Sequence, residues 1–167
     1  MVGFTTLGKA ALNCTLRAAV PDDANNLATI DLAASDHPWT EAQYISISAA
    51  VPKASSGSFS ETVQLLEMDG EICGFVVYSL VMDEGSIHNI AVSPAWQGQG
   101  MARILLREAL KVLRNHGALR CLLEVRISNT VARGLYDSFE FQQDGIRKKY
   151  YPSPNGREDA LLMSKSL

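Results

Sequence analysis

The stretch VSPAWQGQGMARILL, residues 92–106, decides the fold of this chain. It joins a strand-like run to a helix-like run through a turn that contains Gly98 and Gly100. Glycine lets the backbone approach a ligand closely, and the first N–H groups of a helix are unpaired and partly positive. The stretch therefore predicts either a phosphate-binding turn or an ordinary connection, and the turn alone leaves both alternatives open.

Hydrophobic periodicity on both sides of this turn predicts a mixed sheet. Before it lie strands in an antiparallel meander, two of them joined at Asp69 and Gly70, a dipeptide typical of tight hairpins. After it, a helix begins at Met101 and ends near Gly117, and the next strand is expected to run parallel to the strand before the helix. We therefore expect an α/β fold whose mixed, mostly antiparallel sheet has six to seven strands and about four flanking helices. The predicted strands cover residues 14–20, 62–70, 71–82, 86–92, 119–125, 144–151 and 158–167, and the other helices begin at Pro21, Thr40 and Asn129.

Composition suits an ordinary globular protein. Of the 167 residues, 47% are hydrophobic and 20% are charged, and we expect an N-terminal extension over residues 1–14 and a single domain over residues 15–167. Because no apolar run reaches the ~20 residues that span a bilayer, no membrane partner is expected. The net charge of −3 argues against direct nucleic-acid binding, which needs clustered Lys and Arg.

Cysteine and histidine positions predict no metal site. Cys14, Cys73 and Cys121 share no metal-type spacing, and the three histidines do not cluster. Cys73 and Cys121 lie inside apolar strand-like runs, which favours buried free thiols. Free thiols suit a reducing, cytoplasmic location.

A dinucleotide-binding turn is the first competitor for residues 98–103. These residues resemble G-x-G-x-x-G, but Arg103 stands where the last glycine belongs. Glu124, at the end of the next predicted strand, lies roughly where an acid would bind the ribose. However, SPAWQ separates the first glycine from its strand, and only one βαβ unit is visible, so a nicotinamide or flavin cofactor is disfavoured.

Residues 97–102, QGQGMA, resemble instead the Q/R-x-x-G-x-G/A signature of the GNAT acetyltransferase superfamily. From about Arg17 to Leu162 the chain also resembles the bacterial enzymes of this superfamily that acetylate the N-terminal alanine of ribosomal protein S18. The resemblance therefore implies a GNAT fold and an acetyl-CoA-dependent N-acetyltransferase. The segments that carry it are HPWTEAQY (37–44), NIAVSP (89–94), LEVRISNTVARGLYDSFEF (123–141) and RKKYYPSPNGREDALLM (147–163).

The resemblance also assigns roles to individual residues. It implies that Glu124 is the general base and Tyr136 the general acid, and that a β-bulge before the signature exposes N–H groups toward the thioester. It implies that the backbone of residues 90–92 pairs with the pantetheine arm and that the turn after it wraps the pyrophosphate. The residues so assigned to acetyl-CoA are Ile90, Ala91, Val92, Gln97, Gly98, Gln99, Gly100, Met101, Ala102, Arg103 and Asn129.

For the acceptor, the resemblance implies a peptide entry lined by Trp39, Tyr44, Tyr150 and Tyr151. Its expected partner is the N-terminus of ribosomal protein S18 or a similar peptide. Other N-termini, lysine side chains and small amines remain alternatives, as does an inactive CoA-binding module. Aromatic side chains in such loops can also simply pack against the body of the protein.

The same residues also have purely structural interpretations. Glu124 could face water or pair with Arg126, and Tyr136 on an amphipathic helix could belong to the core. Against this, Asn129 and Tyr136 stand seven residues apart, on one helix face, so both can address one ligand. Glu140 replaces the family's glycine after this helix, so either the backbone is strained by roughly 1–2 kcal/mol or the turn has changed.

Overall fold

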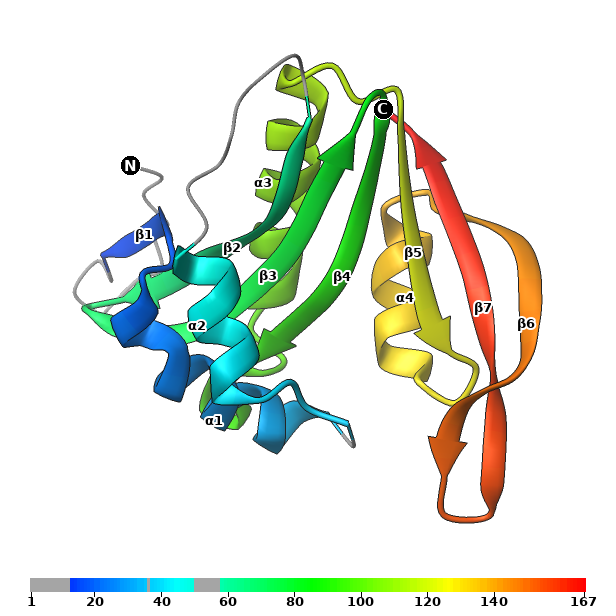
Figure 1. Cartoon of the computed structure of the whole chain (residues 1–167), viewed down its shortest axis with the longest axis horizontal. Coiled ribbons are helices and arrows are strands. Elements are labelled where there is room, and N and C mark those ends of the chain that lie inside the picture. Colours follow the sequence, from blue (N-terminus) through cyan, green and yellow to red (C-terminus); the bar gives the residue numbers. More distant parts are fainter. Residues whose placement is uncertain (1–12, 36, 50–57) are drawn as a thin grey trace.

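Seven strands form one sheet in the order β1-β2-β3-β4-β5-β7-β6 in the computed structural model, which describes residues 13–35, 37–49 and 58–167 (Figure 1). Residues 1–12 of the expected extension lie outside these ranges, and Cys14, assigned to that extension, begins the first strand. The strands are β1 (Cys14–Ala18), β2 (Phe59–Met68), β3 (Glu71–Val81), β4 (Glu84–Val92), β5 (Arg120–Arg126), β6 (Gln142–Ser153) and β7 (Gly156–Ser166). The helices are α1 (Ala24–Ala34), α2 (Glu41–Ala49), α3 (Met101–Asn115) and α4 (Thr130–Ser138), with short 3-10 turns at Pro21–Asp23 and Pro94–Trp96.

The hairpin between β2 and β3 forms where the sequence predicts it. Asp69 and Gly70 have φ values of 51° and 85°, the left-handed conformation that both central residues of a tight hairpin turn adopt. Neighbouring strands of the sheet are antiparallel except β4 and β5, which are parallel and joined through α3. The predicted fold class, a mixed and mostly antiparallel sheet with four flanking helices, is confirmed.

β4 and β5 stay paired over only a short length. Residues 84–87 pair with residues 120–123, and the last pair is Ile87 with Leu123. Beyond it the two strands diverge, as Figure 1 shows. An irregularity in β4 lies where the divergence begins, because Val77 of β3 pairs with Asn89 while Tyr78 pairs with Ile87. His88 is thus the extra residue of a β-bulge, a feature that bends a strand and increases its twist.

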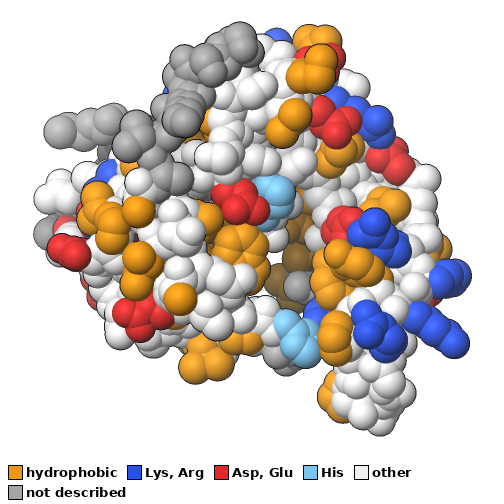
Figure 2. Space-filling model, in the orientation of Figure 1, with side chains coloured by type: hydrophobic (Ala, Val, Ile, Leu, Met, Phe, Trp, Pro, Cys, Tyr) orange, Lys and Arg blue, Asp and Glu red, His pale blue; other side chains and the backbone are white. Residues whose placement is uncertain are grey.

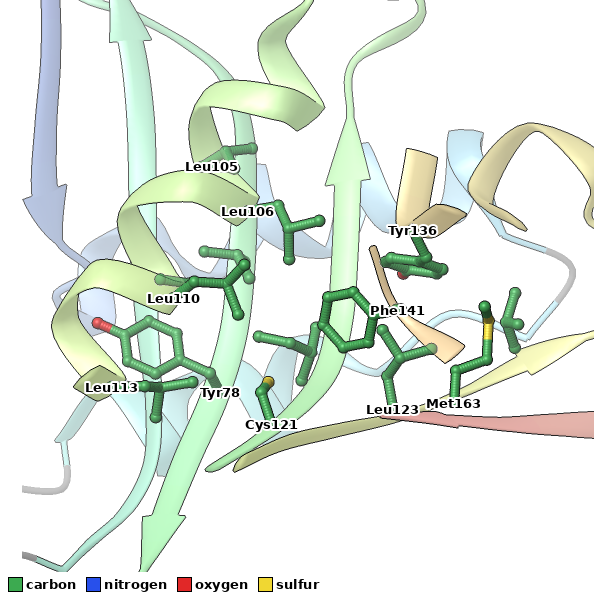
Figure 3. Packing of buried hydrophobic residues seen from close by; sticks show 14 of the residues in the cluster. Tyr78, Leu105, Leu106, Leu110, Leu113, Cys121, Leu123, Tyr136, Phe141 and Met163 are labelled. Atoms are coloured by element: carbon green, nitrogen blue, oxygen red, sulfur yellow. The ribbon is translucent and has the colours of Figure 1, made fainter. Parts of the chain in front are cut away.

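Helices cover both faces of the sheet (Figure 1). α1 and α2 pack on one face around Leu27, Tyr44 and Phe75. α3 and α4 pack on the other face, where the apolar side of α3 forms the larger core together with β2–β5 and β7. Figure 3 shows this second core, with Leu105 and Leu110 pointing from α3 toward the strands.

The C-terminal hairpin is longer than its sequence indicates. Residues 152–157 were expected to be a loop, yet Pro152 pairs with Arg157 and Ser153 with Gly156. A proline would interrupt a central strand, but β6 is the last strand of the sheet and can leave that backbone position unpaired on its outer side. The expected loop is therefore mostly part of the β6–β7 ladder.

The end of α4 keeps the turn geometry that favours glycine. The N–H of Phe141 donates to the carbonyl of Tyr136 at 3.1 Å, and the N–H of Glu140 donates to the carbonyl of Asp137 at 2.9 Å. This is the Schellman pattern, and the Tyr136 and Phe141 rings supply its usual apolar contact, with centroids 5.8 Å apart. Glu140 adopts φ 65°, so the turn is retained and the glutamate accepts the left-handed conformation.

Replacing Glu140 with glycine should therefore raise the free energy of unfolding. Relief of roughly 1–2 kcal/mol of strain is partly offset by the greater freedom of glycine in the unfolded chain, which leaves a gain of about 1 kcal/mol. Urea denaturation would measure it. Glu140 also pairs with Lys165 at 3.0 Å, so Lys165→Gln is the control for losing the ion pair alone. A gain in both variants, or in neither, would contradict the backbone explanation.

Candidate active site

A cavity of about 610 Å³ opens where β4 and β5 diverge. Figure 2 shows the molecule hollowed between the part built from β2–β4 with α1 and α2 and the part built from β5–β7. Its wall combines residues far apart in the sequence: they come from three strands (β4, β5 and β6), two helices (α1 and α4) and the connections that follow α1 and β5. The lining includes Asp31, His37, Trp39, Ile87, His88, Asn89, Ile90, Ala91, Glu124, Val125, Arg126, Ser128, Asn129, Ala132, Tyr136 and Tyr151.

The turn at residues 97–100 forms an uncapped helix N-terminus beyond β4. Gly98 and Gly100 have φ values of 71° and 85°, and Gly100 is the residue that precedes α3. No side chain caps this helix, so the first N–H groups of α3 are available to an anion. The turn is held by Gln97, whose amide donates to the Val92 carbonyl at 3.0 Å, and by Gln99, whose amide donates to the Ala95 carbonyl at 3.0 Å.

Arg103 connects this turn to α4. Its guanidinium donates to Ser138 Oγ at 2.6 Å and lies over the Phe139 ring at 5.1 Å. Met101 is buried and belongs to the core, while Ala102 is partly buried against it. The arrangement fits a pyrophosphate group, since it combines backbone donors, two glycines without a Cβ and a positive charge. Residues 97–103 are not part of the cavity lining given above.

The strand that enters the cavity exposes backbone along one edge. Ile90, Ala91 and Val92 pair with β3 on one side and, beyond Ile87, have no strand partner on the β5 side. Ile90 and Ala91 line the cavity, while Val92 is not part of its lining and packs in the core on the α3 side of the sheet. An extended arm with amide groups could therefore pair with this edge, which fits the pantetheine of acetyl-CoA.

Asn129 begins α4 at the cavity wall. Its Oδ1 accepts a hydrogen bond from the N–H of Ala132 at 3.0 Å, so the side chain caps the helix. This cap uses only Oδ1, so the amide nitrogen can still donate to a ligand, and the residue lines the cavity together with Ala132 and Tyr136. The predicted common face of Asn129 and Tyr136 is present.

Glu124 stands between two cavities. It lines the first and also a second cavity of about 590 Å³ that extends toward β6 and β7, and its side chain is 33% exposed. Its carboxylate accepts from Arg147 at 2.8 Å. Arg126, the partner considered from the sequence, pairs instead with Glu158 at 2.6 Å. A half-exposed carboxylate at the junction of two cavities can accept a proton from a molecule that enters through one of them.

Tyr136 is a buried ring that also reaches the first cavity. It is 5% exposed and packs on Phe141, and both lie in the core beneath α4 (Figure 3). Burial raises the pKa of its hydroxyl, with small contributions from Tyr151 and Cys121. The residue is therefore a core residue that also reaches the cavity wall, and its raised pKa keeps the hydroxyl protonated near neutral pH.

Three of the four aromatic residues assigned to the peptide entry lie together in the second cavity, and Tyr44 does not. Trp39 and Tyr151 line both cavities, and Tyr150 lines the second. Arg126 lies over the Tyr151 ring at 4.4 Å, and burial followed by the charge of Glu124 raises the pKa of Tyr151. Tyr44 is fully buried between α1, α2 and β3, so it lies in the core and not at the entry. Tyr44 is buried because it lies on the inner side of α2, where its ring packs on Phe75.

Tyr44 instead belongs to a polar network that the sequence analysis missed. Its hydroxyl donates to Asp31 Oδ2 at 2.8 Å, and the same oxygen accepts from the Trp39 N–H at 2.7 Å and from Asn89 Nδ2 at 3.1 Å. Asp31 is 1% exposed. One carboxylate of α1 thus holds α2, the Trp39 segment and the bulge of β4. An acidic residue inside the apolar pattern of α1 was the available sequence signal.

Asp31→Asn should destabilise the protein by about 2 kcal/mol, because an uncharged amide oxygen is a weaker acceptor for the three buried donors and the amide nitrogen takes the buried Oδ1 position, which has no partner. The Michaelis constant for a peptide acceptor should rise as well, since the Trp39 segment loses an anchor. Urea denaturation measures the first effect and steady-state kinetics the second. Asp22→Asn, on the exposed side of the turn before α1, is the matched control. Equal stability of both variants would contradict the role of the network.

The described residues contain no cluster of three or more His, Cys, Asp or Glu that could hold a metal ion. Across residues 13–35, 37–49 and 58–167, no helix is long and apolar enough to cross a membrane. Cys73 and Cys121 are buried free thiols, as predicted, and burial raises the pKa of each.

The divergent strands and the uncapped glycine turn before α3 suit an extended donor that carries phosphate, and the carboxylate at the cavity junction suits an acceptor that loses a proton. Residues 24–141 match the model of the Acetyltransferase (GNAT) family, and the chain belongs to this family of acetyl-CoA-dependent N-acetyltransferases.

Within that family, the chain is 36% identical over 148 residues to the [ribosomal protein bS18]-alanine N-acetyltransferase of Escherichia coli (strain K12), covering 84% of this chain and 94% of that protein. It is 38% identical over 146 residues to the protein of the same name from Haemophilus ducreyi, covering 87% and 94%. The crystal structure of the ribosomal-protein-S18-alanine N-acetyltransferase from Escherichia coli superimposes with a TM-score of 0.80 at 32% identity, over 92% of this chain and 94% of that one.

Proposed function

We propose that this enzyme acetylates a protein N-terminal α-amine in the cytoplasm, and that its substrate is the N-terminal alanine of ribosomal protein S18. The names of the relatives support the substrate. The observation that carries the proposal is the position of Glu124 at the junction of the two cavities. The first cavity suits the donor, and the second, lined by Trp39, Tyr150 and Tyr151, suits a peptide.

Acetyl-CoA, when bound, supplies the acetyl group as a reactive thioester. The uncapped N-terminus of α3 would hold its pyrophosphate and the free edge of β4 its pantetheine, with Asn129 beside them. Glu124 accepts a proton from the acceptor amine as the amine attacks. Tyr136, whose pKa is raised by burial and whose hydroxyl is therefore protonated, donates to the departing sulfur.

An α-amine is the acceptor that this site can most readily use. The pKa of an α-amino group is about 7.7–8.0, compared with about 10.4 for lysine, so its neutral form is far more abundant near neutral pH. A carboxylate such as Glu124 is then sufficient to take the remaining proton during attack. The open second cavity also leaves room for the chain that follows a terminal residue.

The test uses two synthetic peptides and the release of free thiol from acetyl-CoA. One peptide begins with the N-terminal alanine and first residues of ribosomal protein S18, and the other has a blocked N-terminus and one lysine. We expect release with the first peptide and at least about tenfold less with the second, given the pKa difference of the two amines. Equal rates would contradict N-terminal specificity. Mass spectrometry of ribosomal proteins from cells that lack the enzyme would then identify which N-terminus loses its acetyl group.

A further inference from the structure

His88 occupies a position in this site that neither the motifs nor the proposed roles explain. As the extra residue of the β4 bulge, it has no pairing partner in β3. Its Nε2 lies 2.7 Å from Ser79 Oγ, and Ser79 follows Tyr78, whose ring packs on the α3 side of the sheet. Side chains alternate along a strand, so Ser79 and the His88 ring face the opposite side, where α1 and α2 lie.

Glu124 faces the same side from the neighbouring strand. Leu123 packs in the core beneath α3 and α4, so the next residue of β5 points away from that core. Ile87 and Leu123 are the last pair of the parallel ladder, and His88 and Glu124 are the residues that follow them. Both line the first cavity and the second. An imidazole and a carboxylate thus stand on adjacent strands at the point where the strands part.

The chemistry of the proposed reaction has a use for two proton acceptors. An α-ammonium group must lose two protons to become an amide: one before the nitrogen lone pair can attack, and one as the C–N bond forms. The thiolate released when the C–S bond breaks takes up one proton, and the other leaves to solvent. A single carboxylate can accept only one of these two protons, so it is sufficient only if the amine is already neutral when it binds.

We propose that His88 accepts the first of these protons, through Nδ1, and that Glu124 accepts the second. In this assignment Nε2–H donates to Ser79 Oγ, which leaves Nδ1 as the base, and Ser79 is a positioning residue that selects this tautomer. His88 returns its proton to solvent through the open cavities, while the proton on Glu124 restores the one that Tyr136 gives to sulfur. The inference rests on the proposed acetylation of an α-amine.

The surroundings of His88 favour an uncharged ring. Burial lowers its pKa from the usual value, and the charge of Glu61 on β2 opposes this only in part. The imidazole is therefore neutral near neutral pH and free to accept a proton. The other titratable or charged groups that line the two cavities, or pair with groups that do, are Asp31 of α1, His37 after it, Glu124 and Arg126 of β5, Tyr136 of α4, Asp144, Arg147, Tyr150 and Tyr151 of β6, and Glu158 of β7.

The test compares wild-type enzyme with His88→Gln over a range of pH. With a terminal amine of pKa about 8, roughly one tenth of the peptide is neutral near pH 7, so a site that accepts only this fraction should lose about tenfold in kcat/KM. Near pH 9 most of the amine is neutral, and the defect should shrink to about twofold or less. Ser79→Ala should show a smaller loss, about threefold near pH 7, with the same recovery.

His116→Gln is the matched control, since His116 lies at the end of α3 and outside both cavities. A defect of His88→Gln that is constant with pH, or no defect in either His88→Gln or Ser79→Ala, would overturn the role of His88 alone. Failure of the wild-type enzyme to release thiol with any amine would overturn both this role and the proposed function. Ser79→Ala keeps the test decisive if His88→Gln does not fold.

Discussion

Replacing Glu124 with glutamine should lower kcat for an alanine-terminated peptide by about 100-fold, while the affinity for CoA changes by less than about twofold. The amide keeps the size of the side chain but cannot accept a proton from the attacking amine. The residue reaches both cavities with a half-exposed side chain, so the loss falls on proton transfer and not on core packing. Steady-state thiol release measures kcat, and calorimetric titration with CoA measures binding.

The substitution also breaks the ion pair between Glu124 and Arg147, so that loss needs its own control. Arg147→Gln removes the same pair and leaves the carboxylate in place. Because the pair is largely exposed, we expect this variant to change kcat by less than about threefold. If both variants lose activity equally, the ion pair matters and the carboxylate is not the base. Unchanged kcat in Glu124→Gln would remove it from the mechanism altogether.

Replacing Tyr136 with phenylalanine should lower kcat by about 20-fold, less than the effect at Glu124. A thiol has a pKa near 8.5, so a departing thiolate gains from a proton donor without strictly requiring one. The ring remains, and its contact with Phe141 remains with it. The effect should therefore appear in turnover, measured by thiol release under saturating acetyl-CoA, and not in the thermal midpoint.

Tyr78→Phe is the matched control for this variant. Tyr78 is a buried tyrosine of the same core, its pKa is raised to about 12 by burial, and it lines neither cavity. Removing its hydroxyl should leave kcat within about twofold of wild type. If Tyr136→Phe behaves like Tyr78→Phe, Tyr136 is a core residue and another group protonates the sulfur.

Local patterns predicted most of the fold. The Asp69–Gly70 hairpin, the parallel β4–β5 pair and the span of α3 follow from turn residues and periodicity that act over a few positions. For Glu140 the sequence predicted either a strained left-handed residue or a changed turn. The structure shows the first of these, with the left-handed conformation retained. The length of the β6–β7 ladder was not predicted, because Pro152 interrupts a strand pattern and only its place at the sheet edge makes it acceptable.

The candidate site was predictable only in part, because the partners of its side chains depend on long-range strand pairing. The residues assigned from the family signature lie at the ends of helices and strands, and local sequence predicts those ends. Side-chain partners depend instead on which strands become neighbours: Glu124 meets Arg147 of β6 and not the nearby Arg126, and Tyr44 turns inward to Asp31. The resemblance implied a β-bulge in this strand, and one is present, but its place at His88 depends on the register between β3 and β4, which no single residue specifies.

The free edge of β4 means that the donor and the acceptor are recognised by different groups of this enzyme. In the proposed complex the donor is bound through backbone groups of residues 90–92 and of the first turn of α3, which substitutions of side chains leave in place. The acceptor meets side chains on the Trp39 segment and on β6, which any substitution alters directly. Related chains can therefore diverge in the N-terminus that they modify while keeping the same acetyl donor, because the donor is bound by backbone groups and the acceptor by side chains.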